Sequence, residues 1–418
     1  MASIKITVDR IQPGLHVRLP VSWKDHPFLL NSFKIKSQEQ VDIIRHLGIK
    51  HVFINPEQSD TQPLPVKDTP ATEPSAEQVE IEQTKKKMWQ EKEERIEKLN
   101  AYRRRVQSCE KEFERSIARL RSVMGKIRSR PIDAVGEATQ MVDSIVDSLL
   151  ADNSVTLHLM SGKSKTKDFY FHSLNVAVIS MMIAKSKGMP AEQIKELAFA
   201  ALFHDMGKVR IPAAILNKNT AYTAPEENYY KLHPKYGLDL ASKIDGFEDA
   251  VLKVIAQHHE RIDGSGYPDG LKGDDIHPYS QIVGLANAYD GLCHARIPSE
   301  QRIPFSALSH LYKNCKHLFN NEDLNILIKF MGVYPPGTVV QLSNSMVGLV
   351  ISVNANAILY PNVLLYDPNV PRNQAPILDL AGSDLKIEAA ILPSRLPEKV
   401  REYLNPRTRI SYFFDTDS

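Results

Sequence analysis

Histidine and aspartate residues recur beside apolar, helix-like segments between residues 172 and 290 of the sequence. Imidazole nitrogens and carboxylate oxygens are good ligands for divalent first-row metals. Adjacent residues on a helix point about 100° apart, so a His-Asp or His-His pair can serve two neighbouring metals. Two metals about 3.5–4 Å apart suit phosphoryl transfer, because they activate a bridging water and neutralise charge on phosphate oxygens. The residues that fit this pattern are His172, His204, Asp205, His233, His258, His259, Asn287 and Asp290.

No single member of this set is decisive, because a lone histidine on an apolar helix is more often a core residue with a hydrogen-bond partner. The joint occurrence is informative, since so many polar groups beside apolar helices would be unfavourable to bury separately. One metal cluster would satisfy them all. The set therefore predicts a metal centre within a helical domain.

The segments that must position these residues predict a mainly α-helical catalytic domain over residues 131–332. Apolar residues with helical spacing and one buried face recur throughout it. The helices that we expect there include Val142–Leu150, Leu174–Ala184, Ala191–Phe203, Ala250–His258 and Ile282–Leu292.

Four further regions flank this domain. Residues 1–57 predict a small mixed α/β domain, with short strands on either side of a helix. Residues 58–78 are rich in Pro, Thr, Ser and acidic residues, which predicts a linker. Residues 79–130 predict one long amphipathic helix, and residues 333–418 predict a small β-rich piece, since β-type runs there alternate with Pro, Asn and Gly.

The long helix has two features that bear on partners. Its basic runs, Lys85–Lys87 and Arg103–Arg105, suggest nucleic acid, but interleaved glutamates favour a solvated face. Its apolar stripe, from Ile96 to Ile127, either pairs with a second chain in a homodimer or packs on the helical domain. The N-terminal domain and this helix suggest a sensory or dimerising attachment, although the sequence names no signal and no signalling partner.

Composition narrows the class of protein. The chain has 418 residues and a formal net charge of only +2, which gives no overall attraction to nucleic-acid polymers or anionic membranes. No run approaches the roughly 20 apolar residues that span a bilayer, and no secretory signal opens the sequence. Three scattered cysteines fit a reducing compartment, so we expect a cytoplasmic protein.

Within residues 165–300 the sequence resembles a known family. His172, the pair His204-Asp205 in HDMGK and the neighbourhood of Asp290 are similar to the HD superfamily of metal-dependent phosphohydrolases. The stretch HHERIDGSGYPDGLKG, from His258 to Gly273, resembles the signature of the HD-GYP subfamily, and HPKYG from His233 fits its intervening motif. Residues 1–57 resemble an uncharacterised domain often fused to HD-GYP domains.

The resemblance implies a helical bundle that hydrolyses cyclic di-GMP or a related cyclic dinucleotide, with two or three divalent metals, usually iron or manganese. It makes Asp205 the bridging ligand and a catalytic residue. It places Lys208 on the scissile phosphate, as a catalytic and substrate-binding residue, and Arg296 on a substrate phosphate; the alternative for both is surface exposure. The implied metal ligands are His172, His204, Asp205, His233, His258 and His259.

The GYP stretch has its own physical interpretation. Glycines there permit backbone angles closed to other residues, and the proline fixes the exit of the loop. Such a loop can approach a ligand closely, or it can be a structural turn plugged by the tyrosine. We expect it to border and shape the pocket through Asp263, Gly264, Gly266, Tyr267 and Pro268.

Three positions depart from the family pattern. Asn287 stands where the family has an aspartate ligand, so its amide oxygen would be a weaker ligand. Ser299 stands where a basic residue is frequent. Asp168 stands where members with three metals have a glutamate, so it would ligate a third metal only if the shorter side chain reaches it; a solvated Asp168 is the alternative.

Three functions remain open at this point. The first is hydrolysis of cyclic di-GMP to the linear dinucleotide pGpG, with GMP as a further product. The second is hydrolysis of another cyclic dinucleotide, such as cyclic GMP–AMP. The third is a catalytically impaired sensor or scaffold, in which Asn287 and Ser299 are the lesions.

Overall fold

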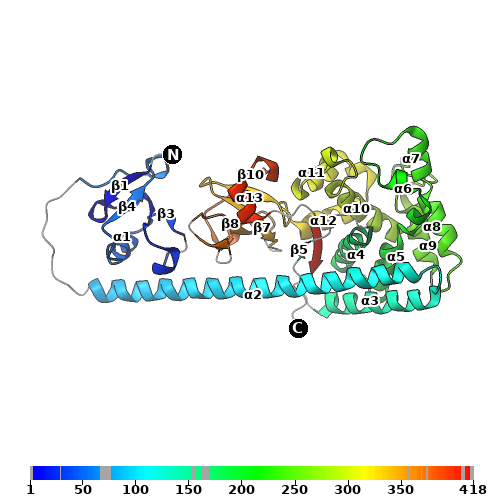
Figure 1. The fold of residues 1–418 in the computed structure, drawn as a ribbon, viewed down its shortest axis with the longest axis horizontal. Helices are drawn as coiled ribbons and strands as arrows, with labels where there is room; N and C mark the ends of the chain where they lie inside the picture. Colours follow the sequence, from blue (N-terminus) through cyan, green and yellow to red (C-terminus); the bar gives the residue numbers. More distant parts are fainter. Residues whose placement is uncertain are drawn as a thin grey trace.

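The computed structural model describes residues 3–28, 30–65, 77–151, 157–161, 169–354, 357–368, 370–372, 375–405 and 410–414. Helices dominate this structure, so the predicted mainly α fold class is confirmed. One long helix, α2 (Glu77–Lys126), runs along the molecule, and three groups of elements lie beside it (Figure 1).

The first group is a small α/β unit near the N-terminus. Four strands form an antiparallel sheet in the order β1-β4-β2-β3. Helix α1 (Gln38–Arg45) begins after Ser37, whose side chain accepts a hydrogen bond from the Gln40 amide, a usual N-cap arrangement. The strands are β1 (Ile4–Thr7), β2 (His16–Arg18), β3 (Ser32–Lys34) and β4 (His51–Ile54).

Helix α2 connects this unit to the rest of the chain. Met88, near its start, packs on the N-terminal core, and the buried Lys92 donates a hydrogen bond to the His26 carbonyl at 2.5 Å. The later part of its apolar stripe is buried in the large helical core, so it packs within the chain. The buried side chains of this part are Cys109, Phe113, Ile117, Leu120, Val123 and Ile127.

Pro131 begins a new helix, α3 (Pro131–Ala151), at the first helical turn, where the missing N–H of proline is tolerated. Helix α3 turns back along α2 and leads into the helical domain (Figure 1). The predicted helix over residues 79–130 is thus α2 followed by a short turn before Pro131.

The helical domain is built around α4 (Phe169–Ser186), whose residues are buried continuously from Ser173 to Ala184. A helix that is apolar on all sides belongs at the centre of a core, and α4 contacts α2, α5, α10 and α12. The other helices are α5 (Ala191–Phe203), α6 (Ala213–Leu216), α7 (Ala224–Tyr230), α8 (His233–Ala241), α9 (Asp249–Gln257), α10 (Pro278–Cys293), α11 (Pro304–Asn314) and α12 (Asn321–Met331).

The third group is an antiparallel five-stranded sheet in the order β10-β6-β7-β8-β9. Its elements are β6 (Val339–Leu342), β7 (Val347–Ser352), β8 (Asn362–Leu365), β9 (Ile377–Asp379), β10 (Ile387–Ile391) and the helix α13 (Glu398–Leu404). It lies beside α2 between the other two groups (Figure 1). Lys36 of the N-terminal unit meets it in an ion pair with Asp384 at 2.7 Å.

The last strand of the described chain belongs to a separate two-stranded sheet. Strand β11 (Ile410–Phe414) pairs antiparallel with β5 (Leu157–Ser161), which lies within the region predicted to be mainly helical. Phe413 packs edge-on against Phe113 of α2 at 5.9 Å, and Phe113 packs on Phe171 of α4 at 5.4 Å. The C-terminal strand is therefore part of the packing next to His172.

None of the described helices is long and apolar enough to cross a membrane.

Candidate metal centre

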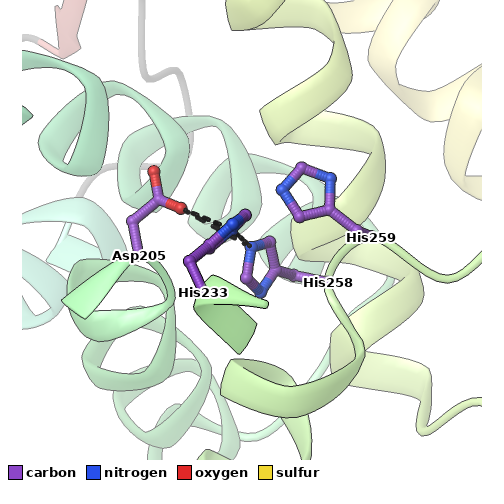
Figure 2. Close-up of side chains that lie close together, drawn as sticks. All are labelled: Asp205, His233, His258 and His259. Atoms are coloured by element: carbon purple, nitrogen blue, oxygen red, sulfur yellow. Dashed lines mark hydrogen bonds and ion pairs between the residues drawn. The ribbon is translucent and has the colours of Figure 1, made fainter. Parts of the chain in front are cut away.

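The predicted ligands come from the ends of four helices. His172 lies in the first turn of α4, and His204 follows the last residue of α5. Asp205 comes next and precedes the 3-10 helix η4 (Met206–Arg210). His233 is the first residue of α8, while the pair His258-His259 follows α9. Helix ends therefore converge, and Figure 2 shows His233 and His258 between Asp205 and His259.

Asp205 joins two groups of candidate ligand atoms. Asp205 with His233, His258 and His259 forms one group, and Asp205 with His172 and His204 forms the other; within each group the ligand atoms lie within 4.8 Å of one another. Every one of these six side chains is buried or nearly so. The sequence prediction that they come together is thus matched by their positions, and their role as metal ligands is a proposal taken up below.

The two oxygens of the Asp205 carboxylate face different histidines. Oδ1 lies 3.3 Å from Nε2 of His233 and 3.6 Å from Nε2 of His258. Oδ2 lies 3.3 Å from Nε2 of His172 and 3.4 Å from Nε2 of His204. One carboxylate placed in this way can bridge two cations, because each oxygen serves one of them.

Backbone carbonyls fix the tautomers of three of these histidines. Nδ1 of His204 lies 2.6 Å from the Ala201 carbonyl, and Nδ1 of His233 lies 2.7 Å from the Tyr230 carbonyl. Nδ1 of His258 lies 3.0 Å from the carbonyl of Ile255. A carbonyl only accepts, so each Nδ1 carries the proton and each Nε2 directs a lone pair toward Asp205. This is the usual arrangement of imidazoles that bind a metal through Nε2.

The unpaired atoms of the centre fit a bound cation. Nε2 of His204 lies 3.3 Å from Nε2 of His172, and the same distance separates the Nε2 atoms of His233 and His258. Among the described residues, the buried atoms Oδ1 of Asp205 and Nε2 of His259 have no hydrogen-bond partner. Buried polar atoms rarely lack a partner, and a divalent ion would satisfy lone pairs on imidazole and carboxylate together.

Electrostatics keep most of these groups in a ligating form. Burial lowers the pKa of His258 to about 3 and also lowers the pKa of His233 and His259, so these rings are neutral near pH 7. Burial would raise the pKa of Asp205, but Lys208 and His204 hold it well below its ordinary value, so the carboxylate is ionised. For His172, burial is outweighed by hydrogen bonds to Asp205 and Asp290, which raise its pKa to about 9.

Asp290 supports the centre from α10 and is not among the grouped ligand atoms. Its Oδ2 lies 2.6 Å from Nδ1 of His172. Its Oδ1 accepts a hydrogen bond from the Asn175 amide at 2.8 Å and lies 3.1 Å from Nδ1 of His294. The carboxylate is therefore fully engaged in orienting other side chains, above all His172.

Asn287 and Asp168, the two candidate ligands that depart from the family pattern, have different outcomes. Asn287 is buried, with 8% of its surface exposed, and lies one helical turn before Asp290 on α10. Nothing in the described part of the chain forms a hydrogen bond with its amide, and its role as a ligand stays a prediction. Asp168 lies outside the described residues.

Lys208 lies on η4 directly beside the carboxylate. Its Nζ is 2.5 Å from Oδ2 of Asp205 and 5.5 Å from the ring centre of Tyr230. Burial disfavours the ammonium, but Asp205 raises the pKa of Lys208 above its ordinary value, so the charge is retained. A fixed cation at this place can contact a phosphoryl oxygen bound next to Asp205, which is the role that the family resemblance implies and which stays a prediction.

The GYP loop borders the centre through its tyrosine. The Tyr267 ring stacks on the His259 ring, with centroids 4.5 Å apart and an interplanar angle of 15°. Gly266 allows this approach, because a Cβ atom there would lie 2.4 Å from the Glu260 backbone. Pro268 follows a cis peptide bond. Asp263 is exposed and Gly264 is half-buried in a turn in which the Asp263 carboxylate accepts hydrogen bonds from the backbone amide and hydroxyl of Ser265, so they contribute to the shape of the loop.

Glu260 anchors this loop and was missed in the sequence analysis. It is 5% exposed, and its carboxylate accepts hydrogen bonds from three consecutive backbone amides. Asp269 and Gly270 donate to Oε1 at 2.8 and 3.2 Å, and Leu271 donates to Oε2 at 3.0 Å. Its position directly after the pair His258-His259 was the available signal, but a glutamate there reads equally well as an exposed residue.

Arg296 is engaged with the segment between α6 and α7. Its Nη1 donates hydrogen bonds to the carbonyls of Lys218 (2.7 Å) and Thr220, and its guanidinium lies 3.7 Å from the ring centre of Tyr222. Arg296 therefore holds the segment of residues 217–223 in place through its backbone carbonyls and the Tyr222 ring. Its predicted contact with a substrate phosphate stays a prediction.

Comparison with known families divides the chain into two parts. Residues 3–138 match a family described as a domain of unknown function, DUF3391. Residues 145–322 match the HD domain family, and they contain all of the candidate ligands described above.

Curated relatives resemble the chain over different lengths. A cyclic di-GMP phosphodiesterase of Pseudomonas aeruginosa is 27% identical over 374 residues, which cover 87% of this chain and 84% of that protein. A cyclic di-GMP phosphodiesterase response regulator of Xanthomonas campestris is 36% identical over 36% of this chain and 40% of its own length. A 3'3'-cGAMP-specific phosphodiesterase of Vibrio cholerae is 30% identical over 39% of this chain and 35% of its own length. The chain thus spans most of the first relative and less than half of the other two.

Proposed function

We propose that this chain, an HD domain protein of the HD-GYP subfamily, is a metal-dependent phosphodiesterase that hydrolyses cyclic di-GMP. The observation that carries the proposal is the buried Asp205 carboxylate, which has two histidine Nε2 atoms near each oxygen and the ammonium of Lys208 beside it. The relative that matches along most of its length is named a cyclic di-GMP phosphodiesterase. That similarity favours cyclic di-GMP over other cyclic dinucleotides.

The centre would hold two divalent cations, which we propose to be iron or manganese. His172 and His204 would bind one ion, His233, His258 and His259 the other, and Asp205 both. Imidazole with carboxylate suits first-row metals such as iron. When bound, such ions lower the pKa of a water and neutralise charge on phosphate oxygens.

The side chains of this protein supply positioning and charge. Asp205 remains ionised inside the domain because Lys208 and His204 lower its pKa. Lys208 holds a cation where negative charge develops on the phosphoryl group, and such preorganised charge is a large part of catalysis in a water-poor site. Asp290 keeps the His172 ring in place. Hydrolysis breaks one ring P–O bond; the hydroxyl of water joins phosphorus, its proton goes to the leaving ribose oxygen, and pGpG results.

Chromatography of the nucleotides tests this function. The purified protein, supplied with iron(II) or manganese(II) without oxygen, should convert cyclic di-GMP to pGpG, with GMP as a slower product. Wild-type protein that contains both metals and leaves cyclic di-GMP intact would refute the proposal.

A second substrate is favoured by a specific observation, the similarity to a 3'3'-cGAMP-specific phosphodiesterase. Equal amounts of cyclic di-GMP and cyclic GMP–AMP in one reaction would rank the two substrates by their kcat/KM values.

The sensor alternative rests on Asn287 and requires nucleotide binding without turnover. A homodimer through α2 would have to use faces of the helix other than the buried stripe from Cys109 to Ile127.

A further inference from the structure

Tyr222 has a polar atom that the fold itself leaves without a partner. Its hydroxyl is buried, yet within the described part of the chain no group accepts or donates a hydrogen bond to it. A buried hydroxyl without a partner is unfavourable, and such an atom in a folded protein calls for an explanation, such as a bound ligand. Tyr222 lies between α6 and α7, and no sequence motif pointed to it.

The neighbours of Tyr222 connect it to the metal centre. Its ring lies 5.5 Å from the Tyr230 ring, and Tyr230 lies 5.5 Å from Nζ of Lys208. Lys208 in turn contacts Asp205. The guanidinium of Arg296 also lies over the Tyr222 ring, 3.7 Å from the ring centre. A row of neighbouring side chains therefore connects Asp205 to Arg296 through Lys208, Tyr230 and Tyr222.

The backbone around Tyr222 is held on both sides. Arg296 donates to the carbonyls of Lys218 and Thr220, before the tyrosine. After it, Thr223 and Glu226 form a capping box at the start of α7. Glu226 also pairs with Lys218, which closes the segment on itself. The hydroxyl is therefore set in place before any ligand binds, which reduces the entropy lost on binding.

We propose that Tyr222 is a substrate-binding residue whose hydroxyl donates a hydrogen bond to a phosphate oxygen of the nucleotide. The cations of Lys208 and Arg296, which both belong to this row of side chains, make this part of the site attractive to an anion. The hydroxyl lacks an acceptor, and phosphate oxygens are strong acceptors. A cyclic dinucleotide has two phosphates, so one can bind at the metal centre while the other lies near this row. The inference rests on the proposed function and adds a contact that the family signature does not contain.

The variant Tyr222→Phe tests this contact, because it removes one oxygen and keeps the ring under Arg296. We expect KM for cyclic di-GMP to rise about tenfold, the value of one lost hydrogen bond to a charged group, with kcat changed much less. Metal content should equal that of the wild type. The melting temperature without nucleotide should stay the same or rise, since an unsatisfied hydroxyl has been removed. The matched control is Tyr229→Phe, at a tyrosine of α7 that is 39% exposed.

The outcomes separate this inference from the proposed function. An unchanged KM in Tyr222→Phe, with an active wild type, overturns the role of Tyr222 and leaves the function standing. If the wild type neither binds nor hydrolyses cyclic di-GMP or cyclic GMP–AMP, the proposed function fails. Calorimetry with inorganic phosphate then decides on Tyr222: weaker binding by the variant supports the anion contact, and equal binding or none by either protein overturns it.

Discussion

Oδ2 of Asp290 lies 2.6 Å from Nδ1 of His172, across the contact between α10 and α4. The other nitrogen of the same ring, Nε2, lies 3.3 Å from Asp205. A carboxylate that accepts from the outer nitrogen of a histidine fixes the ring and makes its inner nitrogen a better ligand. Asp290 therefore acts on the centre through His172, although the sequence pattern placed it among the candidate ligands.

Replacing Asp290 with asparagine should weaken metal binding by about 10- to 100-fold, the usual effect of removing such a supporting carboxylate. Metal retained after dialysis against graded chelator measures this. Asp323→Asn is a matched control, because Asp323 is also buried and paired, with Lys187 at 2.6 Å, but belongs to α12. Equal metal retention in both variants would contradict the role of Asp290.

Replacing Asn287 with aspartate should raise the affinity of the centre for metal, because a charged oxygen replaces a neutral amide oxygen. We expect a measurable increase in metal bound per chain at limiting iron or manganese, with activity raised or unchanged. Asn314→Asp, at an exposed position of α11, provides the same charge change elsewhere. If Asn287→Asp behaves like this control, Asn287 is no ligand.

Replacing Glu260 with alanine should loosen the GYP loop, since three backbone amides lose their acceptor. A buried donor without an acceptor costs about 1–3 kcal/mol, so denaturant unfolding should show a loss of at least about 2 kcal/mol. KM should rise because Tyr267 no longer stacks firmly on His259. The control is Glu248→Ala, at an exposed glutamate before α9. A stable variant with normal KM would show that the loop holds its shape without Glu260.

The stability of the N-terminal unit should depend on His26 below neutral pH. Burial lowers the pKa of His26 to about 4, although its bond to Asn31 acts in the opposite direction. The unfolded chain takes up this proton near pH 6.5 and the folded chain only near pH 4, so stability is complete above pH 6.5 and falls as the pH decreases toward 4. The free energy of unfolding should therefore fall by about 3 kcal/mol between pH 7 and pH 4, at about 1.4 kcal/mol per pKa unit.

Unfolding curves at pH 7, 5.5 and 4 measure this dependence. The variant His26→Gln should be less stable at pH 7 and show a flatter pH dependence. His46→Gln is the control, since His46 belongs to the same unit and is exposed. Parallel curves for wild type and His26→Gln would mean that another group titrates in this range.

The sequence predicted the helical fold and the gathering of the histidines because both follow from local patterns. Apolar spacing marks α4, α5 and α9, and the candidate histidine ligands stand at or next to the ends of these helices. The pairing of β5 with β11 was not predicted, because it joins segments about 250 residues apart and each is too short to stand out.

The contacts that hold the candidate ligands and the GYP loop in place could not be predicted from the sequence either. Asp290 and Glu260 act through partners on other elements or across a loop, and only the fold shows which nitrogen or amide each one meets. Arg296 was predicted on a phosphate, whereas the structure adds two backbone carbonyls and the Tyr222 ring to its surroundings. The sequence does not show which groups the long, flexible side chain of an arginine contacts.

Metal content and cyclic di-GMP hydrolysis, measured together on wild type, Asp205→Asn and the exposed control Asp239→Asn, test the central claim most directly. We predict two metals per chain and formation of pGpG in the wild type and the control. Asp205→Asn should keep its fold and lose both metal and turnover, because the bridging charge is gone. Full metal loading and normal hydrolysis in Asp205→Asn would contradict a centre built around this carboxylate.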